Sequence, residues 1–361
     1  MKKLLALLLV AVMAMGLCSV ASAEGYDQAL IDAAKAEGEL TVYGSCEEAY
    51  LNAACDKFQE LFGITVNRQR LSTGEVAAKI EEENGNPSAD VWFGGTTDPY
   101  NESVAKGLLE PYEAKNASHL LGDMYRDKDG CWYGIYKGIL GFMCNTEELE
   151  RLGLEEPKDW DDLLKPEYKG LIWMSNPNTA GTAKLVINTM IQKYGHDEGI
   201  KYLVDLDKNI EVYTKSGSGP SKYVGSGECV IGISFLSDGI ARIEDGCTNL
   251  RLVLPAEGTP CRIAATAIFK GAAHPNAAKL WTEFALSPAC VELAAANGSF
   301  QFPVLGNAQR PSTSAAGLDL RGVVALDRDE SADVIDACIE ETMTALAEAG
   351  ADVSAERFQT P

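Results

Sequence analysis

Segments with the pattern of β-strands alternate with helical segments along most of this chain. The first series comprises a strand at 40–45, a helix at 47–62, a strand at 64–71, a helix at 72–83 and a strand at 90–95. A strand, a helix and a second strand in this order form a right-handed unit with parallel strands. Ligands bind such sheets beside the carboxyl ends of the strands. The alternation therefore predicts an α/β fold whose functional residues lie in the loops that follow strands.

Two extended runs, Trp132–Gly138 and Leu140–Asn145, are expected to carry the chain into a second α/β series, and a strand at 264–270 is expected to return. The further expected strands are 171–175, 210–214, 229–235 and 250–255, and the further helices are 182–194, 197–206, 221–225, 276–286, 288–296 and 331–349. A chain of this length exceeds one ordinary core. We therefore expect residues 24–138 with 262–305 to form lobe 1, and residues 139–261 with 306–361 to form lobe 2.

Residues 1–23 have the pattern of a secretory signal peptide. Lys2 and Lys3 precede an apolar stretch, and Ala21-Ser22-Ala23 is an A-x-A cleavage site. The apolar stretch is too short for a transmembrane helix, and the large leucine before Cys18 does not suit lipidation of that cysteine. We expect cleavage after Ala23 and an exported protein, periplasmic or on the extracellular face of the cytoplasmic membrane.

The chain is strongly acidic. Removal of the two signal lysines takes the formal net charge from −22 to −24. Such a charge argues against nucleic acid, anionic membrane surfaces and heparin-like partners. It does not exclude a small oxyanion, because neutral N–H and O–H donors can hold one while the outer surface stays acidic.

Nine cysteines remain beyond Cys18. Cys46 and Cys55 share a predicted helix, where nine residues span roughly 13 Å, too far for a disulfide. Cys247 and Cys261 flank one strand and its turn, so they are the best candidates for a pair. No C-x-x-C motif or Cys/His cluster indicates zinc or redox chemistry.

The sequence contains no recognisable catalytic constellation. G-x-S-x-G, G-x-x-x-x-G-K-[ST] and H-E-x-x-H are all absent, and the three histidines lie in polar segments. Adjacent carboxylates such as Asp161-Asp162 occupy solvated helix faces. We therefore expect no enzyme activity, no cofactor and no resident metal.

Loops rich in hydroxyls and glycine follow five of the predicted strands. Exposed backbone N–H groups with Ser or Thr hydroxyls at a helix start can hold an oxyanion. One such loop is usually a turn or a helix cap, but five at the carboxyl ends of strands predict a binding site. The candidate residues are Ser45, Thr73, Gly95, Thr96, Thr179, Gly181, Thr182, Ser216 and Ser218.

The order of motifs resembles the solute-binding proteins of ABC importers. The similarity runs from LTVYGSCEEA through NPSADVWFGG, WYGIYKGILGFMCN, VYTKSGSGPSKYVGSGE and IGISFLSDGI to HPNAAKLWTEFALSP. The group that binds ferric iron or phosphorylated solutes is the most similar. The resemblance implies a type II periplasmic-binding fold, in which two α/β lobes joined by crossing strands close around one ligand. It also implies a monomer that delivers its solute to a permease in the membrane.

The resemblance leaves two ligand classes open. Ferric binders present adjacent tyrosines where this chain has Phe235-Leu236-Ser237-Asp238, and Cys46 stands where their first-lobe histidine often lies. Fe³⁺ prefers hard anionic oxygen ligands. The missing tyrosine pair makes ferric iron the alternative rather than the first choice.

Hexose-phosphate binders of the same group carry a Phe-Leu-His-Asp motif. It corresponds to Phe235–Asp238, with Ser237 in place of the histidine and Asp238 retained. Their acidic residue before a Gly-Thr pair corresponds to Glu257. The resemblance implies that the hydroxyl loops hold the phosphate, while Ser237, Asp238 and Glu257 face the organic part of the ligand. We expect the chain to capture a small phosphorylated or other oxyanionic organic solute.

Overall fold

The computed structural model describes residues 25–312, 318 and 332–358, so the expected signal peptide lies outside the described residues. The chain divides into two compact units. Unit 1 contains residues 25–137, Ile263–Ser299 and Pro303–Gln309, and unit 2 contains Gly138–Arg262, Phe300–Phe302 and the described residues from Arg310 on. The boundaries expected at 138/139 and 261/262 differ from these by one residue. Residues 300–302 and 306–309 fall in the opposite units to those expected.

Unit 1 is built on a mixed sheet. Strands β1 (Glu39–Gly44), β2 (Thr65–Arg70) and β3 (Val91–Thr96) are parallel, in the order β2-β1-β3. Strand β10 (Cys261–Phe269) continues the sheet antiparallel to β3, and β4 (Leu109–Glu110) pairs with β10. The helical segments of this unit are α2 (Gln28–Glu37), α3 (Glu48–Phe62), α4 (Thr73–Glu83), α5 (Thr97–Ala105), η1 (Lys115–His119), η2 (Asp123–Tyr125), α11 (Pro275–Ala285), α12 (Pro288–Val291) and α13 (Leu293–Ala296). The two-residue strand β11 (Phe302–Pro303) pairs with β5 (Trp132–Asn145).

Local sequence signals fix where the unit 1 helices begin and end. At the start of α4, the Ser72 hydroxyl accepts from the Glu75 N–H, and the Glu75 carboxylate accepts from the Ser72 N–H. This reciprocal capping box satisfies two of the N–H groups that a helix start leaves without partners. Helix α3 ends at Gly63, which adopts the left-handed conformation (φ 68°) that glycine takes without strain.

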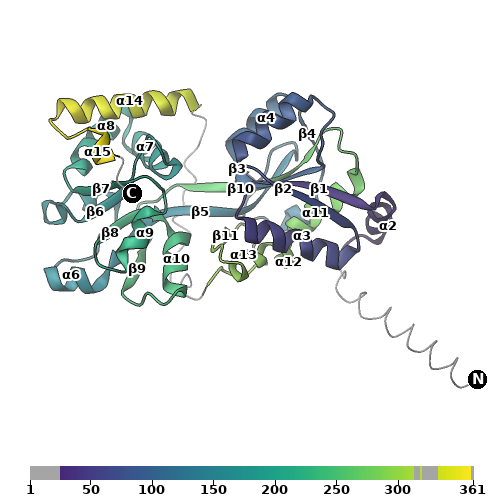
Figure 1. Ribbon diagram of the computed structural model, residues 1–361, viewed down its shortest axis with the longest axis horizontal. Helices are drawn as coiled ribbons and strands as arrows, with labels where there is room; N and C mark the ends of the chain where they lie inside the picture. The colour runs from purple at the N-terminus through teal and green to yellow at the C-terminus, as the bar shows by residue number, and fades with distance from the viewer. Residues whose placement is uncertain (1–24, 313–317, 319–331, 359–361) are drawn as a thin grey trace, which may run out of the picture. The chain divides into compact units, whose positions relative to one another are not determined.

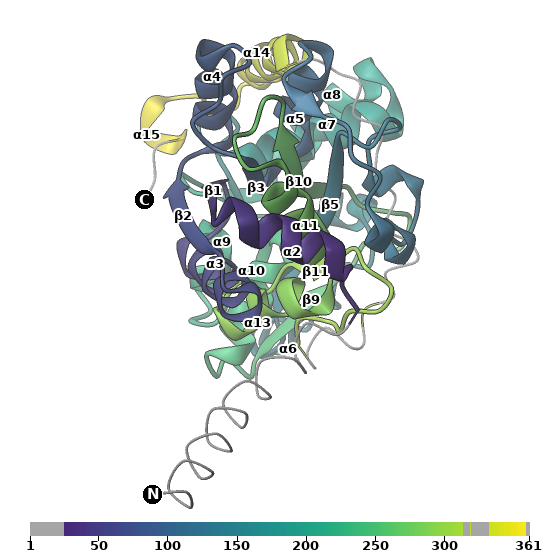
Figure 2. The ribbon, with the colours of Figure 1, turned by 90° about the vertical axis from the view of Figure 1, so that its right-hand side faces the viewer.

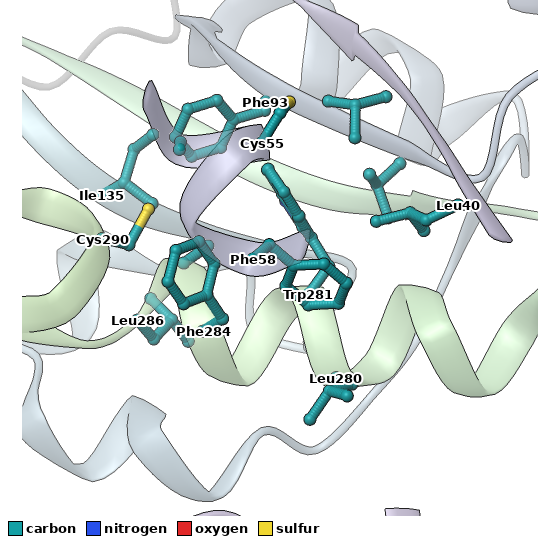
Figure 3. Packing of buried hydrophobic residues seen from close by; sticks show 14 of the residues in the cluster. Leu40, Cys55, Phe58, Phe93, Ile135, Leu280, Trp281, Phe284, Leu286 and Cys290 are labelled. Atoms are coloured by element: carbon teal, nitrogen blue, oxygen red, sulfur yellow. The ribbon is translucent and has the colours of Figure 1, made fainter. Parts of the chain in front are cut away.

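An aromatic cluster fills the core of unit 1 (Figure 3). Phe58 of α3 lies 5.3 Å from Trp281 and 5.6 Å from Phe284, both on α11, measured between ring centroids. Phe93 of β3 meets Trp281 edge-on at 5.2 Å. Helix α2 packs along α11, as Figure 2 shows. Because α11 comes from residues near 280, the return of the chain completes the core of the first unit.

Unit 2 repeats the α/β plan with a different strand order. Strands β6 (Ile172–Ser175), β7 (Ile210–Thr214) and β8 (Ile231–Phe235) are parallel, in the order β8-β6-β7, and β5 pairs antiparallel with β8 and with β9 (Leu250–Val253). Its helical segments are α6 (Thr146–Leu152), η3 (Trp160–Leu164), η4 (Pro166–Tyr168), α7 (Gly181–Tyr194), α8 (His196–Asp207), α9 (Gly219–Val224), α10 (Leu236–Glu244), α14 (Ala332–Glu348) and α15 (Ala355–Phe358). Helix α14 contacts α8 and α7 (Figure 1). Among the described residues, none of the helices combines the length and the apolar character needed to cross a bilayer.

Strand β5 is one continuous strand where the sequence predicts two runs. All fourteen of its residues are buried, and the boundary between the units falls within it, after Lys137. A glycine is needed at position 141 of this strand, since a Cβ on Gly141 would lie 2.6 Å from a Leu236 methyl and 2.7 Å from the Val253 carbonyl oxygen.

None of the nine cysteines in the described chain forms a disulfide, which corrects the expected pairing of Cys247 with Cys261. The Cys247 thiol instead donates to Asn249 Oδ1 at 3.1 Å, and Cys261 is buried in an apolar cluster. Burial raises the pKa of the Cys55 thiol to about 12 and that of Cys131 to about 11. These cysteines therefore pack as small apolar side chains in the neutral thiol form.

We predict that the protein, purified without reductant and lacking Cys18, titrates for nine thiols after denaturation. The native protein should react slowly, because burial keeps the thiols protonated and inaccessible. Addition of reductant should leave the thermal midpoint unchanged. A count of seven, or a midpoint lowered by reductant, would show a disulfide and contradict the prediction.

Candidate ligand-binding loops

The loop after β7 has its carbonyl groups fixed toward the body of unit 2. Thr214 Oγ1 donates to the carbonyl oxygen of Ser216 at 2.9 Å, and Ser234 Oγ donates to that of Gly217 at 2.7 Å. In a planar trans peptide the N–H points opposite to the C=O. The N–H groups of Gly217 and Ser218 therefore point away from the two hydroxyls, and neither has an acceptor within the described residues. Two consecutive free N–H groups form a concavity suited to an anion.

The start of α7 lies against the same loop. A Cβ on Gly217 would come within 2.2 Å of Thr182 Oγ1, and a Cβ on Gly219 within 2.4 Å of Thr214 Oγ1. Thr179 Oγ1 donates to the carbonyl oxygen of Lys215 at 2.8 Å. The structure thus brings Thr179 and Thr182 together with the loop after β7. Gly181, the first residue of the fourteen-residue helix α7, places the positive end of the helix dipole there.

The two candidate serines of the loop touch each other. Ser216 Oγ and Ser218 Oγ lie 3.1 Å apart, and Ser216 is exposed. Ser218 precedes α9, but its hydroxyl does not cap that helix. One of the two hydroxyl hydrogens is used in this contact, so the other hydroxyl remains available to donate to an acceptor beside the free N–H groups.

Asp238 joins this cluster through a buried hydroxyl. Ser234 Oγ, which holds the Gly217 carbonyl, also lies 2.9 Å from Asp238 Oδ2. Ser237, the preceding residue, is 4% exposed, and its hydroxyl has no hydrogen-bond partner in the described chain. Ser175 Oγ, at the end of β6, is also buried without a partner there. Buried hydroxyls are nearly always satisfied, so these two point to a ligand or water that completes them.

Glu257 does not lie with the other candidates. Its carboxylate pairs with Lys193 Nζ at 2.9 Å and is 63% exposed, and its backbone N–H donates to Asp159. Lys193 is in the last turn of α7, eleven residues after Thr182, which is about 16 Å along a helix axis. Glu257 thus forms a surface ion pair at the opposite end of α7, and its expected role in ligand binding stays a prediction.

The candidate residues of unit 1 also cluster. Gly95 has φ +83°, and a Cβ there would lie 2.5 Å from Thr73 Oγ1 and 2.9 Å from the Ser45 Cβ. The Ser45 hydroxyl accepts from the Trp92 indole N–H at 3.0 Å. Thr96 stands before α5, and its hydroxyl makes no capping bond. The loops after β1, β2 and β3 thus meet, as parallel strands require.

Two polar residues beside the candidate loops, one in each unit, were not predicted. Arg70, the last residue of β2, donates from Nε to the Cys46 carbonyl oxygen at 3.2 Å and is otherwise exposed. It supplies a cation beside the neutral donors of unit 1. Its position at the carboxyl end of a strand is a usable signal, whereas the prediction for these loops rested on hydroxyls and glycines.

Asn176 is the second missed residue. Its Oδ1 accepts from the Asn178 N–H at 2.8 Å, and its carbonyl oxygen accepts from the N–H of Thr179 and Ala180. Its Nδ2 donates to the carbonyl oxygen of Phe358 in α15. One side chain therefore fixes the loop that leads into α7.

Cys46 stands where ferric binders of the resembling group often place a histidine. It is 3% exposed, and burial raises its pKa well above the ordinary value. The side chain is therefore a neutral thiol rather than a thiolate ligand. Among the described residues, no group of three or more His, Cys, Asp or Glu side chains is arranged to hold a metal ion.

Two α/β units with polar loops at the carboxyl ends of their parallel strands define a solute-binding protein of the type II periplasmic-binding fold, as predicted. The model of one family, bacterial extracellular solute-binding protein, matches residues 86–317. The chain belongs to this family, whose periplasmic members bind small solutes and work with the permeases of ABC transporters.

Similar proteins are known from several bacteria. An uncharacterized protein of Haemophilus influenzae is 39% identical over 271 residues, which cover 74% of this chain and 78% of the relative. A putative 2-aminoethylphosphonate-binding periplasmic protein of Salmonella typhimurium is 26% identical over 228 residues, or 61% of this chain and 64% of the relative. The solved structure of the periplasmic binding protein AfuA from Actinobacillus pleuropneumoniae, with fructose-6-phosphate bound, has a TM-score of 0.69 and 34% identity. It covers 86% of this chain and 99% of AfuA.

We predict that Gly217→Ala destabilises unit 2 by about 1–3 kcal/mol, because the added methyl must displace Thr182 Oγ1. Urea unfolding followed by tryptophan fluorescence measures the loss. Gly122→Ala is the matched control, since Gly122 has extended backbone and a Cβ added there would meet nothing within 4 Å. Equal stability of the two variants would show that the two loops are not in contact.

Proposed function

We propose that this chain captures a small organic solute that carries a phosphate or phosphonate group and delivers it to an ABC permease. The observation that carries the proposal is the pair of free N–H groups at Gly217 and Ser218, beside the Thr182 hydroxyl. A tetrahedral oxyanion presents several acceptor oxygens, and this loop presents several donors.

The donors of these loops suit an anionic group although the chain as a whole is acidic. Neutral donors and the dipole of α7 can hold the oxyanion without a cluster of lysines, although the chain carries a net charge of −22. Arg70 adds a cation beside the unit 1 cluster. The relatives point the same way, since AfuA was solved with fructose-6-phosphate and the Salmonella protein is named for a phosphonate.

The part of the ligand beyond the oxyanion is assigned to Asp238 and Ser237. Asp238 accepts hydrogen bonds and carries negative charge, which suits a hydroxyl or an ammonium group of the solute. The unpartnered Ser237 hydroxyl can donate or accept beside it. Glu257 has no part in this proposal, because Lys193 already pairs with it.

The proposal includes the cellular role. The chain acts as an exported monomer and performs no chemistry on its solute. Ferric iron is the alternative ligand. Phe235–Asp238 lacks a tyrosine pair, and Cys46 is a buried neutral thiol, so iron would need oxygen ligands from elsewhere.

Native mass spectrometry of the purified protein tests the ligand class directly, by the mass of any solute that co-purifies. A thermal-shift series then compares fructose 6-phosphate, 2-aminoethylphosphonate, inorganic phosphate, fructose and Fe³⁺, because a ligand that binds only the native state raises the midpoint. The phosphorus oxyanions should raise it and fructose should not. A coloured iron complex without any response to the oxyanions would establish the alternative.

We predict that Thr182→Val and Ser218→Ala each weaken binding of the responsive oxyanion by about 1–3 kcal/mol, because each removes a donor to a charged oxygen. Isothermal calorimetry measures the loss. Thr344→Val on α14 and Ser226→Ala after α9 are the matched controls, since both hydroxyls are exposed and contact groups away from the loops. Unchanged affinity in both test variants would remove these loops from the site.

A further inference from the structure

Lys137 is a buried cation whose only polar contact in the described chain is neutral. The side chain is 4% exposed, and Nζ donates to Tyr125 Oη at 2.8 Å. The ammonium also lies 5.2 Å from the centre of the Tyr125 ring. No carboxylate pairs with Lys137 among the residues that the structure describes. Both residues belong to unit 1, and Lys137 is its last residue on β5.

A phenol does not compensate this charge. An ammonium carries three N–H donors, and Tyr125 accepts one of them. The tyrosine itself packs with Ile263, Val304 and Leu120, which offer no polar side-chain group. Burial of an unpaired charge costs several kcal/mol, and a neutral side chain of similar length would avoid that cost. The charge is therefore unfavourable for folding in the absence of an anion.

The buried carboxylates among the described residues of unit 1 have partners of their own. Glu283, the best-buried carboxylate of unit 1 after Asp90, accepts from Tyr112 and from two backbone N–H groups. Asp90 accepts from Thr41 and His274. Lys137 differs from both in keeping donors without acceptors.

We propose that Lys137 binds an anionic oxygen of the solute and makes the protein select charged over neutral ligands. The inference rests on the proposed function, because it requires an anionic solute, but it uses none of the loop residues assigned above. Tyr125 is a positioning residue: its hydroxyl holds the ammonium in place until the anion arrives. The phosphate and phosphonate probes distinguish which kind of oxyanion the lysine serves.

Lys137→Met tests the proposal, because methionine keeps much of the length and removes the charge. We expect the ligand-free variant to have a thermal midpoint at or above that of the wild type, since an unpaired buried charge is gone. Affinity for fructose 6-phosphate, 2-aminoethylphosphonate or inorganic phosphate, whichever binds the wild type, should fall about ten- to hundredfold. Lys128→Met is the control, because Lys128 is 86% exposed and should change neither quantity.

A second variant distinguishes the positioning role of Tyr125 from the anion-binding role of Lys137. Tyr125→Phe should lower the ligand-free midpoint, because the ammonium loses its remaining contact, and it should largely retain anion affinity. The inference is overturned if Lys137→Met binds the anions as tightly as the wild type. It is also overturned if weaker binding comes with a lower ligand-free midpoint, since that marks a structural lysine.

The two proposals fail in different ways. If the wild type binds none of the anions, the proposed function and this inference fall together. If it binds them and Lys137→Met binds them equally well, only the inference about Lys137 falls.

Discussion

Parallel strands impose the constraint on which the rest of this molecule depends. After each strand the chain must return through a crossover before the next one starts, so the loops that follow neighbouring strands meet at one edge of the sheet. In unit 1 this brings Ser45, Thr73 and Gly95 into contact, and in unit 2 it brings Thr182 against Gly217. The topology of the sheet alone brings these short polar loops together, so the clusters form from residues that share no sequence motif.

Buried hydroxyls of unit 2 fix the orientation of the N–H donors in the loop after β7. Thr214 and Ser234 are both fully buried, and each holds a carbonyl oxygen of the 216–218 segment. Their bonds orient the peptide planes, and the free N–H groups follow from that orientation. Glycine at 217 and 219 allows the close approach, since a side chain at either position would collide with a threonine hydroxyl. The surface proposed to bind the solute is thus positioned by the buried side chains of Thr214 and Ser234.

The sequence predicted local features well and long-range polar contacts poorly. The Ser72–Glu75 capping box and the helix end at Gly63 depend on neighbouring residues, so short motifs reveal them. Lys137 is buried by segments distant in the sequence, and Asn176 donates a hydrogen bond to the distant Phe358 carbonyl oxygen. No local sequence pattern predicts either feature. The ion pair of Glu257 with Lys193 joins residues 64 positions apart, and a motif match does not reveal such a contact. Strand β5 is continuous although two runs were predicted, and its burial along all fourteen residues comes from tertiary packing.

The alkylation rates of the buried thiols would measure how often each core of this protein unfolds locally. Cys46, Cys55 and Cys290 lie in the core of unit 1, and Cys144 is packed in that of unit 2. Each can be alkylated only when the surrounding core exposes it, so alkylation rates report local unfolding. Cys46, Cys55 and Cys290 would report on unit 1 and Cys144 on unit 2, so the stabilities of the two units could be measured separately in one unlabelled molecule.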